Sequence, residues 1–304
     1  MKPSAYIGRF APSPTGPLHF GSLVCALASY LDARHHQGQW LVRIEDIDPP
    51  REIPGSTATI LKQLESHGLL WDGDLLYQSQ RSDAYNAALA QLQNDGLTYS
   101  CDCNRQRVAE LGGIYDGHCR QRQVSSGSAA TRLRLPENPN NSIIAFTDLV
   151  IGDYHQSLVK EVGDFVVKRR DGLFSYQLAV TVDDQFQNIS HIIRGADLLS
   201  STPRQLYVQR CLGASVEQVA AIQLGHLPLA VNGEGQKLSK QNHAPALVPG
   251  DESTNLWQAL QWLQQAPPIE LRGDSQQALL SWAIANWSMA SIPKTATIPA
   301  PSAK

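Results

Sequence analysis

The 304-residue sequence has no long hydrophobic run, few cysteines and no strong excess of charge. No apolar segment is long enough to cross a bilayer, and residues 1–14 lack the apolar core of a signal peptide, so we expect a cytoplasmic protein that contacts no membrane. Five cysteines are an odd and sparse set, which argues against a disulfide framework. The net charge of −3 provides no global field that attracts nucleic acid, so any contact with RNA has to come from local basic patches.

The hydrophobic pattern predicts an α/β protein. A strand at 6–10 runs into a loop rich in proline and glycine, and a helix follows from about His19. A second strand at 40–44 is apolar enough for the middle of a parallel sheet. The remaining elements of this pattern are helices at 56–67, 82–95, 177–186 and 202–212 and strands at 191–194 and near Leu224.

Two further segments depart from this pattern. Short strand-like runs at 131–135, 143–148 and 165–168 stand among turns, which predicts an α+β insertion at 97–172 between the two parts of the α/β domain, 1–96 and 173–243. The segment 244–304 carries helical pattern around 256–263 and 278–287, so we expect a short, mostly helical C-terminal segment. Its end, 288–304, is rich in alanine, proline, serine and threonine and is expected to fray.

The segment 9–22, with the sequence RFAPSPTGPLHFGS, joins the first strand to the first helix. Free backbone N–H groups and the helix dipole favour an anion at such a helix start. Gly21 lets a ligand approach the backbone closely, and His19 can donate to a phosphate. Taken alone, the segment also fits an ordinary strand–helix turn in which His19 caps the helix.

A second polar loop, 235–242, contains two lysines. Lys237 and Lys240 can neutralise the charge that develops on a triphosphate as its α-phosphorus is attacked. Alone, this loop fits a solvated surface turn better. The two weak motifs nevertheless occur in one chain, more than 200 residues apart, each in a structural setting that suits nucleotide binding.

Together the two loops resemble the signature motifs of class I aminoacyl-tRNA synthetases, in the form used by the glutamyl branch. The tetrad at 19–22, HFGS, matches the "HIGH" motif without its second histidine, and KLSKQ at 237–241 matches "KMSKS" with two substitutions. The resemblance implies a Rossmann-like catalytic domain in which His19 and Lys240 are catalytic. The implied ATP site consists of His19, Gly21, Ser22, Lys237, Ser239 and Lys240.

Charged residues near the ends of three predicted strands suit a dicarboxylic amino acid. Arg9 and Arg194 can grip carboxylates, Glu45 can hold an ammonium group and Tyr176 can orient the ligand, although each charged residue also fits a surface ion pair. The stretches RIEDID at 43–48 and RGADLL at 194–199 resemble glutamyl-tRNA synthetase segments. This resemblance implies an L-glutamate site made of Arg9, Phe10, Ala11, Pro12, Ser13, Glu45, Tyr176 and Arg194, with Asp46, Asp48 and Asp197 fixing loops.

Cys101, Cys103 and Cys119 have a spacing that suits a tetrahedral zinc ion. Tyr115, Asp116 and His118 are all in reach as the fourth ligand, and chemistry alone favours the imidazole; three reduced thiols without metal are the other interpretation. The segment 113–119 resembles the zinc insert of the glutamyl-Q synthetases, in which a tyrosine oxygen is the fourth ligand, and so implies Tyr115. The zinc would be structural, because the insertion is poor in apolar residues. Arg105, Arg107, Arg120 and Arg122 form a basic patch beside it that can take RNA phosphates, although each arginine fits solvated surface charge equally well.

About sixty residues follow the lysine loop, too few for the helical anticodon-binding region of a full glutamyl-tRNA synthetase. With the zinc insert and the stretch KLSKQNHAPAL, this resembles the family of glutamyl-Q tRNA(Asp) synthetases. The implied activity is ATP- and Mg²⁺-dependent formation of glutamyl-adenylate, then transfer of glutamate to the queuosine base of tRNA(Asp). Separately, we expect a monomer. Three alternatives stay open: a conventional glutamyl-tRNA synthetase without its anticodon domain, a non-catalytic tRNA-binding paralogue, and a small-molecule nucleotidyltransferase, which the glutamate-type pocket disfavours.

Overall fold

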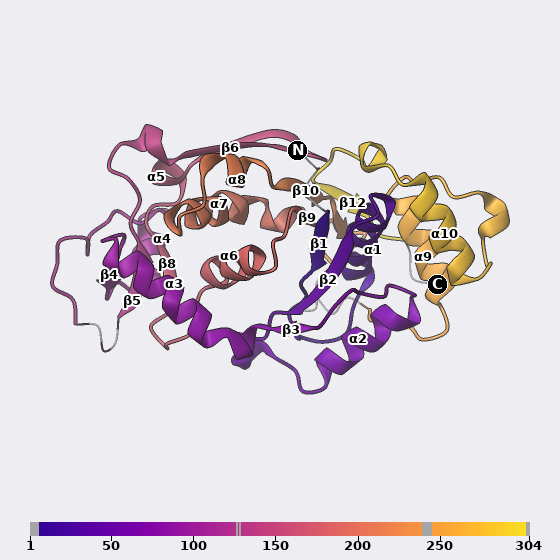
Figure 1. The fold of residues 1–304 in the computed structure, drawn as a ribbon, viewed down its shortest axis with the longest axis horizontal. Helices are drawn as coiled ribbons and strands as arrows, with labels where there is room; N and C mark the ends of the chain where they lie inside the picture. Colours follow the sequence, from indigo (N-terminus) through magenta and orange to yellow (C-terminus); the bar gives the residue numbers. More distant parts are fainter. Residues whose placement is uncertain (1–5, 126, 128, 239–244, 302–304) are drawn as a thin grey trace.

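A parallel sheet forms the centre of the molecule, whose computed structural model describes residues 6–125, 127, 129–238 and 245–301 (Figure 1). Its strands are β1 (Ile7–Phe10), β2 (Gln39–Ile44), β3 (Leu76–Tyr77), β9 (His191–Gly195) and β10 (Gln223–Leu227). They lie in the order β10-β9-β1-β2-β3. All run in the same direction, so their carboxyl ends meet along one edge, where ligands bind in sheets of this kind.

Helices cover both faces of this sheet. Helix α1 (Phe20–His35) packs on one face, in a core cluster that includes Ile193, while α6 (Tyr176–Phe186) and α7 (Thr202–Cys211) pack on the other with Ile192. Neighbouring residues of β9 therefore point to opposite cores, as strand geometry requires. The remaining helices of this domain are α2 (Ser56–Ser66), α3 (Ser82–Asn94) and α8 (Val216–Ala220).

The α/β pattern predicted from the sequence is confirmed, with element ends that differ by only a few residues. Within the described ranges, no helix is both long enough and apolar enough to span a membrane. The prediction omitted several short elements because their runs are too brief to show a period.

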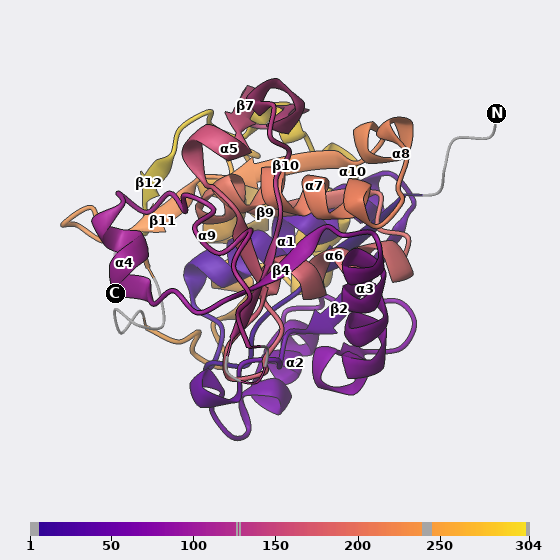
Figure 2. The same ribbon diagram turned by 90° about the vertical axis from the view of Figure 1, so that its left-hand side faces the viewer.

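The predicted insertion, 97–172, extends to one end of the long axis, and Figure 2 views the molecule from that end. Its antiparallel sheet has the order β4-β5-β8, and a separate hairpin, β6–β7, runs back along the domain to β10 (Figure 1). Its elements are β4 (Thr98–Cys101), α4 (Arg105–Glu110), β5 (Ala130–Leu133), β6 (Ile143–Asp148), β7 (Gly152–Ser157), α5 (Leu158–Glu161) and β8 (Phe165–Lys168).

The C-terminal segment lies at the opposite end of the long axis (Figure 1). Helices α9 (Glu252–Trp262) and α10 (Gln276–Asn286) pack against α1. The prediction that 288–304 frays is wrong for the described part of that stretch. Strand β12 (Thr297–Pro299) pairs in parallel with β11 (Leu229–Val231), and the indole of Trp262 donates to the Pro299 carbonyl at 2.9 Å. A pairing with a strand so distant in the sequence leaves no local signal.

One buried carboxylate joins three distant parts of the chain. Asp32 on α1 accepts a hydrogen bond from the Tyr6 hydroxyl at 2.5 Å and another from the Trp287 indole at 2.9 Å. All three side chains are buried. This contact therefore fixes the start of β1 and the end of α10 to the same helix.

We expect Asp32→Asn to destabilise the protein by about 1–3 kcal/mol, because an amide offers one acceptor oxygen where two buried donors need one each. The midpoint of urea unfolding, followed by tryptophan fluorescence, measures the change. Asp74→Asn is the matched control, since Asp74 is exposed and the charge change is the same. Equal midpoints for the two variants would contradict this role for Asp32.

Candidate active site

A cleft of about 420 Å³ opens at the carboxyl ends of β1 and β9. We call it the activation cleft. It brings together most of the predicted ATP and glutamate residues, namely Arg9, Phe10, Ala11, Pro12, Ser13, His19, Gly21, Ser22, Tyr176, Arg194 and Lys237. Glu45 lines a neighbouring hollow of about 220 Å³, the acidic pocket, which shares Ser13, Thr15 and Tyr176 with the cleft. The two spaces therefore adjoin at Ser13 and Tyr176.

His19 caps helix α1 at the edge of the cleft. Its Nδ1 accepts a hydrogen bond from the Ser22 backbone N–H at 3.3 Å, which satisfies one of the donors that every helix start exposes. The cap and the ligand site are thus compatible, because His19 also lines the cleft. A Cβ on Gly21 would lie 3.3 Å from the His19 ring, a tight contact that glycine avoids.

The stem of the lysine loop is held beside the start of α1, because Ala230 lies next to both Gly21 and Leu238. The backbone N–H of Leu238 donates to the Ala230 carbonyl at 2.7 Å, and Lys237 Nζ lies 2.6 Å from Asp197 Oδ2. Asp197, predicted to fix a loop, therefore holds a lysine that lines the cleft. Ser239 and Lys240 lie outside the described residues.

Arg9 is anchored by a buried carboxylate that the prediction did not include. Asp184 on α6 faces Arg9 at 3.2 Å and Arg43 at 2.8 Å, and all three side chains are at least nine-tenths buried. Burial alone would raise the pKa of Asp184, but the two guanidinium groups hold it below its usual range. Asp184 therefore stays ionised, and it leaves part of Arg9 facing the cleft.

Glu45 has an unsatisfied acceptor. Its side chain is 8% exposed, and its Oε1 accepts no hydrogen bond from the described residues, although Arg43 lies 3.5 Å away. Burial raises the pKa of Glu45 to about 7, against the lowering influence of Arg43 and Arg9. A cationic ligand in the acidic pocket would supply the missing donor and stabilise the carboxylate.

Arg194, in contrast to Glu45, requires an anionic ligand. Its guanidinium is 5% exposed, and in the described part of the chain no carboxylate lies within ion-pair distance of it. It donates instead to uncharged partners: Thr202 at 2.6 Å, Gln205 at 2.8 Å, His226 at 3.2 Å and Tyr176 at 3.5 Å. Burial lowers the pKa of Arg194. An anionic ligand in the cleft would balance this buried charge.

The support of Arg194 reaches into the insertion. Asp148, the last residue of β6, lies 2.6 Å from His226 Nδ1, and both side chains are fully buried. This contact places a proton on Nδ1, so that Nε2 accepts from Arg194. Burial lowers the pKa of His226, which keeps the imidazole neutral. Asp148 thereby orients the guanidinium through the imidazole.

Several of these supporting residues were missed by the sequence prediction: Arg43, Asp148, Asp184, Thr202, Gln205 and His226. The one available signal was the polar pair Asp183–Asp184 inside the apolar pattern of helix α6. The others come from segments far apart in the chain, and no motif connects them. Their roles follow from contacts that exist only in the folded protein.

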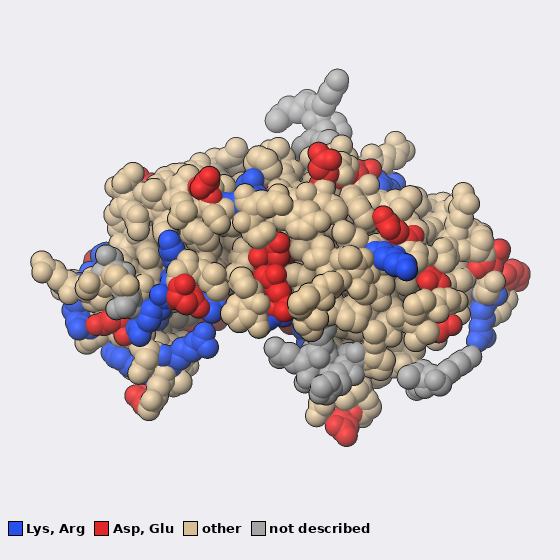
Figure 3. All heavy atoms as spheres, turned by 90° about the horizontal axis from the view of Figure 1, so that it is seen from below, with Lys and Arg blue, Asp and Glu red and all other residues tan. Residues whose placement is uncertain are grey.

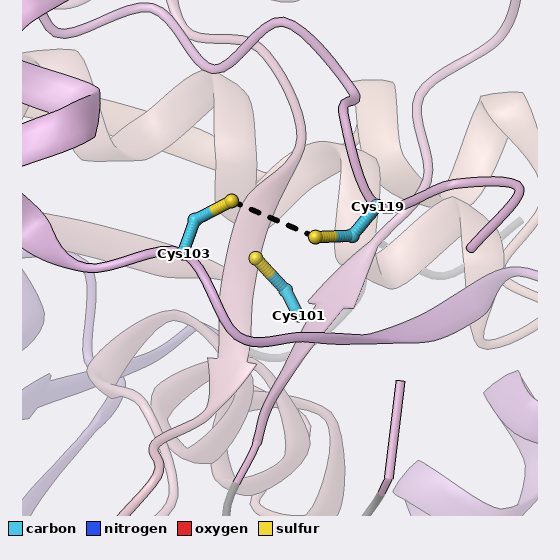
Figure 4. Close-up of side chains that lie close together, drawn as sticks. All are labelled: Cys101, Cys103 and Cys119. Carbon is cyan, nitrogen blue, oxygen red and sulfur yellow. Dashed lines mark hydrogen bonds between the residues drawn. The ribbon is translucent and has the colours of Figure 1, made fainter. Parts of the chain in front are cut away.

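The three predicted cysteine ligands converge in the insertion (Figure 4). The sulfur atoms of Cys101, Cys103 and Cys119 all lie within 4.8 Å of one another. The Tyr115 hydroxyl lies 3.3 Å from Cys101 Sγ and 3.6 Å from Cys103 Sγ, whereas His118 is exposed and its ring is not part of the cluster. This arrangement can hold a metal ion, and it favours the tyrosine over the histidine.

The spacing of these atoms suits zinc. With Zn–S bonds of about 2.3 Å and a Zn–O bond of about 2.0 Å, the ligand atoms of a tetrahedron lie about 3.5–3.8 Å apart. The observed separations include 3.3 and 3.6 Å between oxygen and sulfur and 3.5 Å between Cys103 and Cys119. Gly163 makes the position of Tyr115 possible, because a Cβ there would lie 2.2 Å from the Tyr115 carbonyl oxygen.

The predicted basic patch is largely neutralised. Arg107 pairs with Asp116, Arg120 with the buried Asp164, and Arg122 with Asp102, at 2.6–3.1 Å. Arg120 therefore has a structural partner within the insertion, and the contact of these arginines with RNA phosphates stays a prediction. Arg105 is exposed and lines a separate hollow beside the cysteine cluster. Sequence spacing alone could not show which arginines have carboxylate partners.

Comparison with known proteins places this geometry in a family. Residues 7–249 match the model of the catalytic domain of tRNA synthetases class I (E and Q). Proteins named glutamyl-Q tRNA(Asp) synthetase are 51% identical over 300 residues in Shigella flexneri and in Escherichia coli K12, covering 98% of this chain and 94% of each relative. The one from Pseudomonas fluorescens Pf-5 is 50% identical over 296 residues, covering 97% of this chain and 96% of the relative.

Solved structures show the same fold at lower identity. A glutamate tRNA ligase from Elizabethkingia meningosepticum, crystallised with its amino acid, superposes with a TM-score of 0.79 at 22% identity and covers 98% of this chain and 67% of its own. The glutamate-tRNA synthetase of Elizabethkingia anophelis gives the same score, with 68% of its chain covered. The chain thus belongs to the class I tRNA synthetases (E and Q) and, within them, to the family of glutamyl-Q tRNA(Asp) synthetases.

Proposed function

We propose that this protein activates L-glutamate with ATP and transfers it to the queuosine base of tRNA(Asp), acting as a monomer in the cytoplasm. The names of its relatives support the acceptor, and the residues of the cleft support the amino acid. The observation that carries the proposal is a pair of groups near Tyr176: the buried cation Arg194, whose hydrogen-bond partners in the described residues are all uncharged, and the Glu45 oxygen that has no donor there.

L-Glutamate satisfies both groups at once. Its ammonium group pairs with Glu45. Its side-chain carboxylate accepts hydrogen bonds from the guanidinium group of Arg194 beside the Tyr176 hydroxyl. Arg9 and the backbone from Phe10 to Ser13 line the space between. A buried arginine without a carboxylate partner discriminates strongly against glutamine, which carries no charge to balance it.

ATP occupies the part of the cleft at the start of α1. A glutamate α-carboxylate oxygen attacks the α-phosphorus, the bond to the bridging oxygen breaks, and pyrophosphate leaves. His19, Gly21, Ser22 and Lys237 line this part of the cleft and stabilise the charge. Ser239 and Lys240 are assigned to the same role by their place in the KLSKQ motif. Mg²⁺ bound to ATP would supply further positive charge to the phosphates. Catalysis rests on positioning, and no side chain becomes covalent.

The second step forms an ester on the acceptor. A hydroxyl oxygen of the queuosine base attacks the glutamyl carbonyl carbon, and the bond from that carbon to the phosphate oxygen breaks. AMP leaves with the electron pair, and the hydroxyl proton passes to its phosphate. The reacting carbonyl is accessible from the acidic pocket, because this pocket adjoins the cleft at Ser13 and Tyr176.

We also propose that Cys101, Cys103, Cys119 and Tyr115 hold one structural zinc ion. The apolar cluster around them is small, with Tyr99, Val108 and Val124 packed against it. Arg132 Nε donates to Cys101 Sγ at 3.1 Å, and its guanidinium lies 3.8 Å from the centre of the Tyr115 ring. Both contacts orient ligands from outside the cluster. The metal would stabilise the insertion and take no part in the reaction.

We expect radiolabelled glutamate to appear on tRNA(Asp) that carries queuosine and not on the same tRNA without it. Glutamate-dependent exchange between ATP and pyrophosphate should proceed without any tRNA. Labelling of tRNA(Glu) at its 3′ end would instead indicate a conventional glutamyl-tRNA synthetase. Zinc-replete protein that shows no exchange would indicate a non-catalytic tRNA-binding protein.

The KM for glutamate should rise as the pH falls below about 7. Without ligand, Glu45 binds a proton below its raised pKa of about 7, and the ammonium group of the substrate has to displace that proton. Each pH unit below this value then raises KM by up to about tenfold. Pyrophosphate exchange on either side of pH 7 measures this. A KM that does not change with pH would show that Glu45 is already ionised in the free enzyme.

Cys119→Ser should reduce bound zinc from about one ion per chain to almost none and lower the unfolding temperature. Cys211→Ser is the control, because Cys211 lies on α7 outside the cluster. Tyr115→Phe should weaken zinc retention against a chelator, and His118→Ala should not. Metal analysis and thermal unfolding report both results. If His118→Ala weakened zinc retention and Tyr115→Phe did not, His118 would be the fourth ligand.

A further inference from the structure

The acidic pocket contains acceptor atoms that the activation step does not use. Gln78 is fully buried, and its amide N–H donates to Asp183 at 2.8 Å, while its Oε1 has no hydrogen-bond donor among the described residues. Glu52 is half-buried, but its Oε1 is inaccessible to solvent and also has no donor, and Glu52 forms no ion pair in the described part of the chain. Both residues line the pocket beside Glu45. Unsatisfied buried acceptors favour a ligand that brings N–H or O–H donors.

The other charged residues of the pocket are already paired. Asp48 contacts Arg51 and also Arg169, at 3.0 Å from the latter, and Arg169 is 2.5 Å from Asp171. Glu52 therefore carries the negative charge that remains once Glu45 binds the amino acid. Burial raises the pKa of Glu52, and the nearby Asp46 and Asp48 raise it further. A cation in the pocket would lower the pKa of Glu52 and favour its ionised form.

The size and connections of the pocket suit part of a nucleotide. A volume of about 220 Å³ is below the roughly 300–1,000 Å³ typical of pockets that enclose a whole small ligand. On one side the pocket adjoins the activation cleft at Ser13 and Tyr176. On the other it shares Val166 and Arg169 with a hollow of about 730 Å³ that Arg105, Arg132 and Arg170 also line.

Basic side chains gather over the end formed by the insertion, with acidic side chains among them (Figure 3). The hollow lined by Arg105 and Arg170 is thus suited to backbone phosphates, and the acidic pocket to a positively charged base. An RNA strand that enters along the insertion would reach the cleft with its base first.

We propose that the acidic pocket binds the substituent of the acceptor base, with Glu52 and Gln78 as the acceptors that select it. Queuosine carries a secondary amine, protonated at neutral pH, next to a cyclopentene ring with two hydroxyls. Glu52 accepts from the ammonium group and Gln78 Oε1 from the hydroxyl that does not react. The other hydroxyl then faces the adenylate across Ser13 and Tyr176. This inference rests on the proposed acceptor and adds the residues that recognise it.

The test compares the two half-reactions in Glu52→Gln, which removes the charge and keeps the shape. We expect the kcat/KM for transfer to queuosine-containing tRNA(Asp) to fall roughly 10- to 100-fold relative to the rate of pyrophosphate exchange. Glu65→Gln is the control, because Glu65 is exposed on α2 and the charge change is equal. An unchanged ratio of the two rates in Glu52→Gln would overturn the proposal.

A binding measurement separates this proposal from the proposed function. Free queuosine nucleoside is titrated into wild-type protein and Glu52→Gln by calorimetry, with guanosine as the comparison. Tighter binding of queuosine that Glu52→Gln abolishes supports the pocket even if no tRNA accepts glutamate, in which case the proposed transfer fails. Normal transfer by Glu52→Gln together with equal binding by both proteins leaves the transfer intact and rules out the pocket.

Discussion

The carboxylate of Asp184 lies between the guanidinium groups of Arg9 and Arg43, and the arrangement of the active site depends on this contact. It joins strands β1 and β2 to helix α6 across the interior of the domain. Without it, two buried cations from neighbouring strands would repel each other at low local dielectric. Arg43 Nη2 donates to Asp184 Oδ1 at 2.8 Å, whereas Glu45 Oε1 lies 3.5 Å from the same nitrogen and therefore has no donor. The ammonium site is a consequence of this unequal sharing.

The balance of buried charges explains why the site suits an acidic amino acid. Apart from Asp183, which pairs with Arg81, the buried set around Tyr176 contains the cations Arg9, Arg43 and Arg194 and the anions Asp184 and Glu45. One positive charge is left over when Glu45 is ionised, and it belongs to Arg194, which only uncharged groups support. L-Glutamate at neutral pH carries one net negative charge. With L-glutamate bound, the charges of this buried set sum to zero.

The contiguous parts of the site were predictable from sequence, and its supports were not. The strand, loop and capped helix at 7–35 lie next to one another in the chain, and so do the residues of the lysine loop that are described. Arg194 was identified from its place at a strand end, but Asp148, Thr202 and His226 reach it from separate elements. Strand β12 was missed for the same reason, since its partner β11 lies more than sixty residues away.

The hairpin β6–β7 complicates any division of the chain into exchangeable modules. By sequence it belongs to the insertion, yet Asp148 at the end of β6 orients His226 and, through it, the arginine that faces the amino acid. A chimera with an insertion exchanged at residues 97 and 172 would replace this carboxylate together with the cysteine cluster. The choice of amino acid and the shape of the insertion are therefore physically linked, and divergence in one constrains divergence in the other.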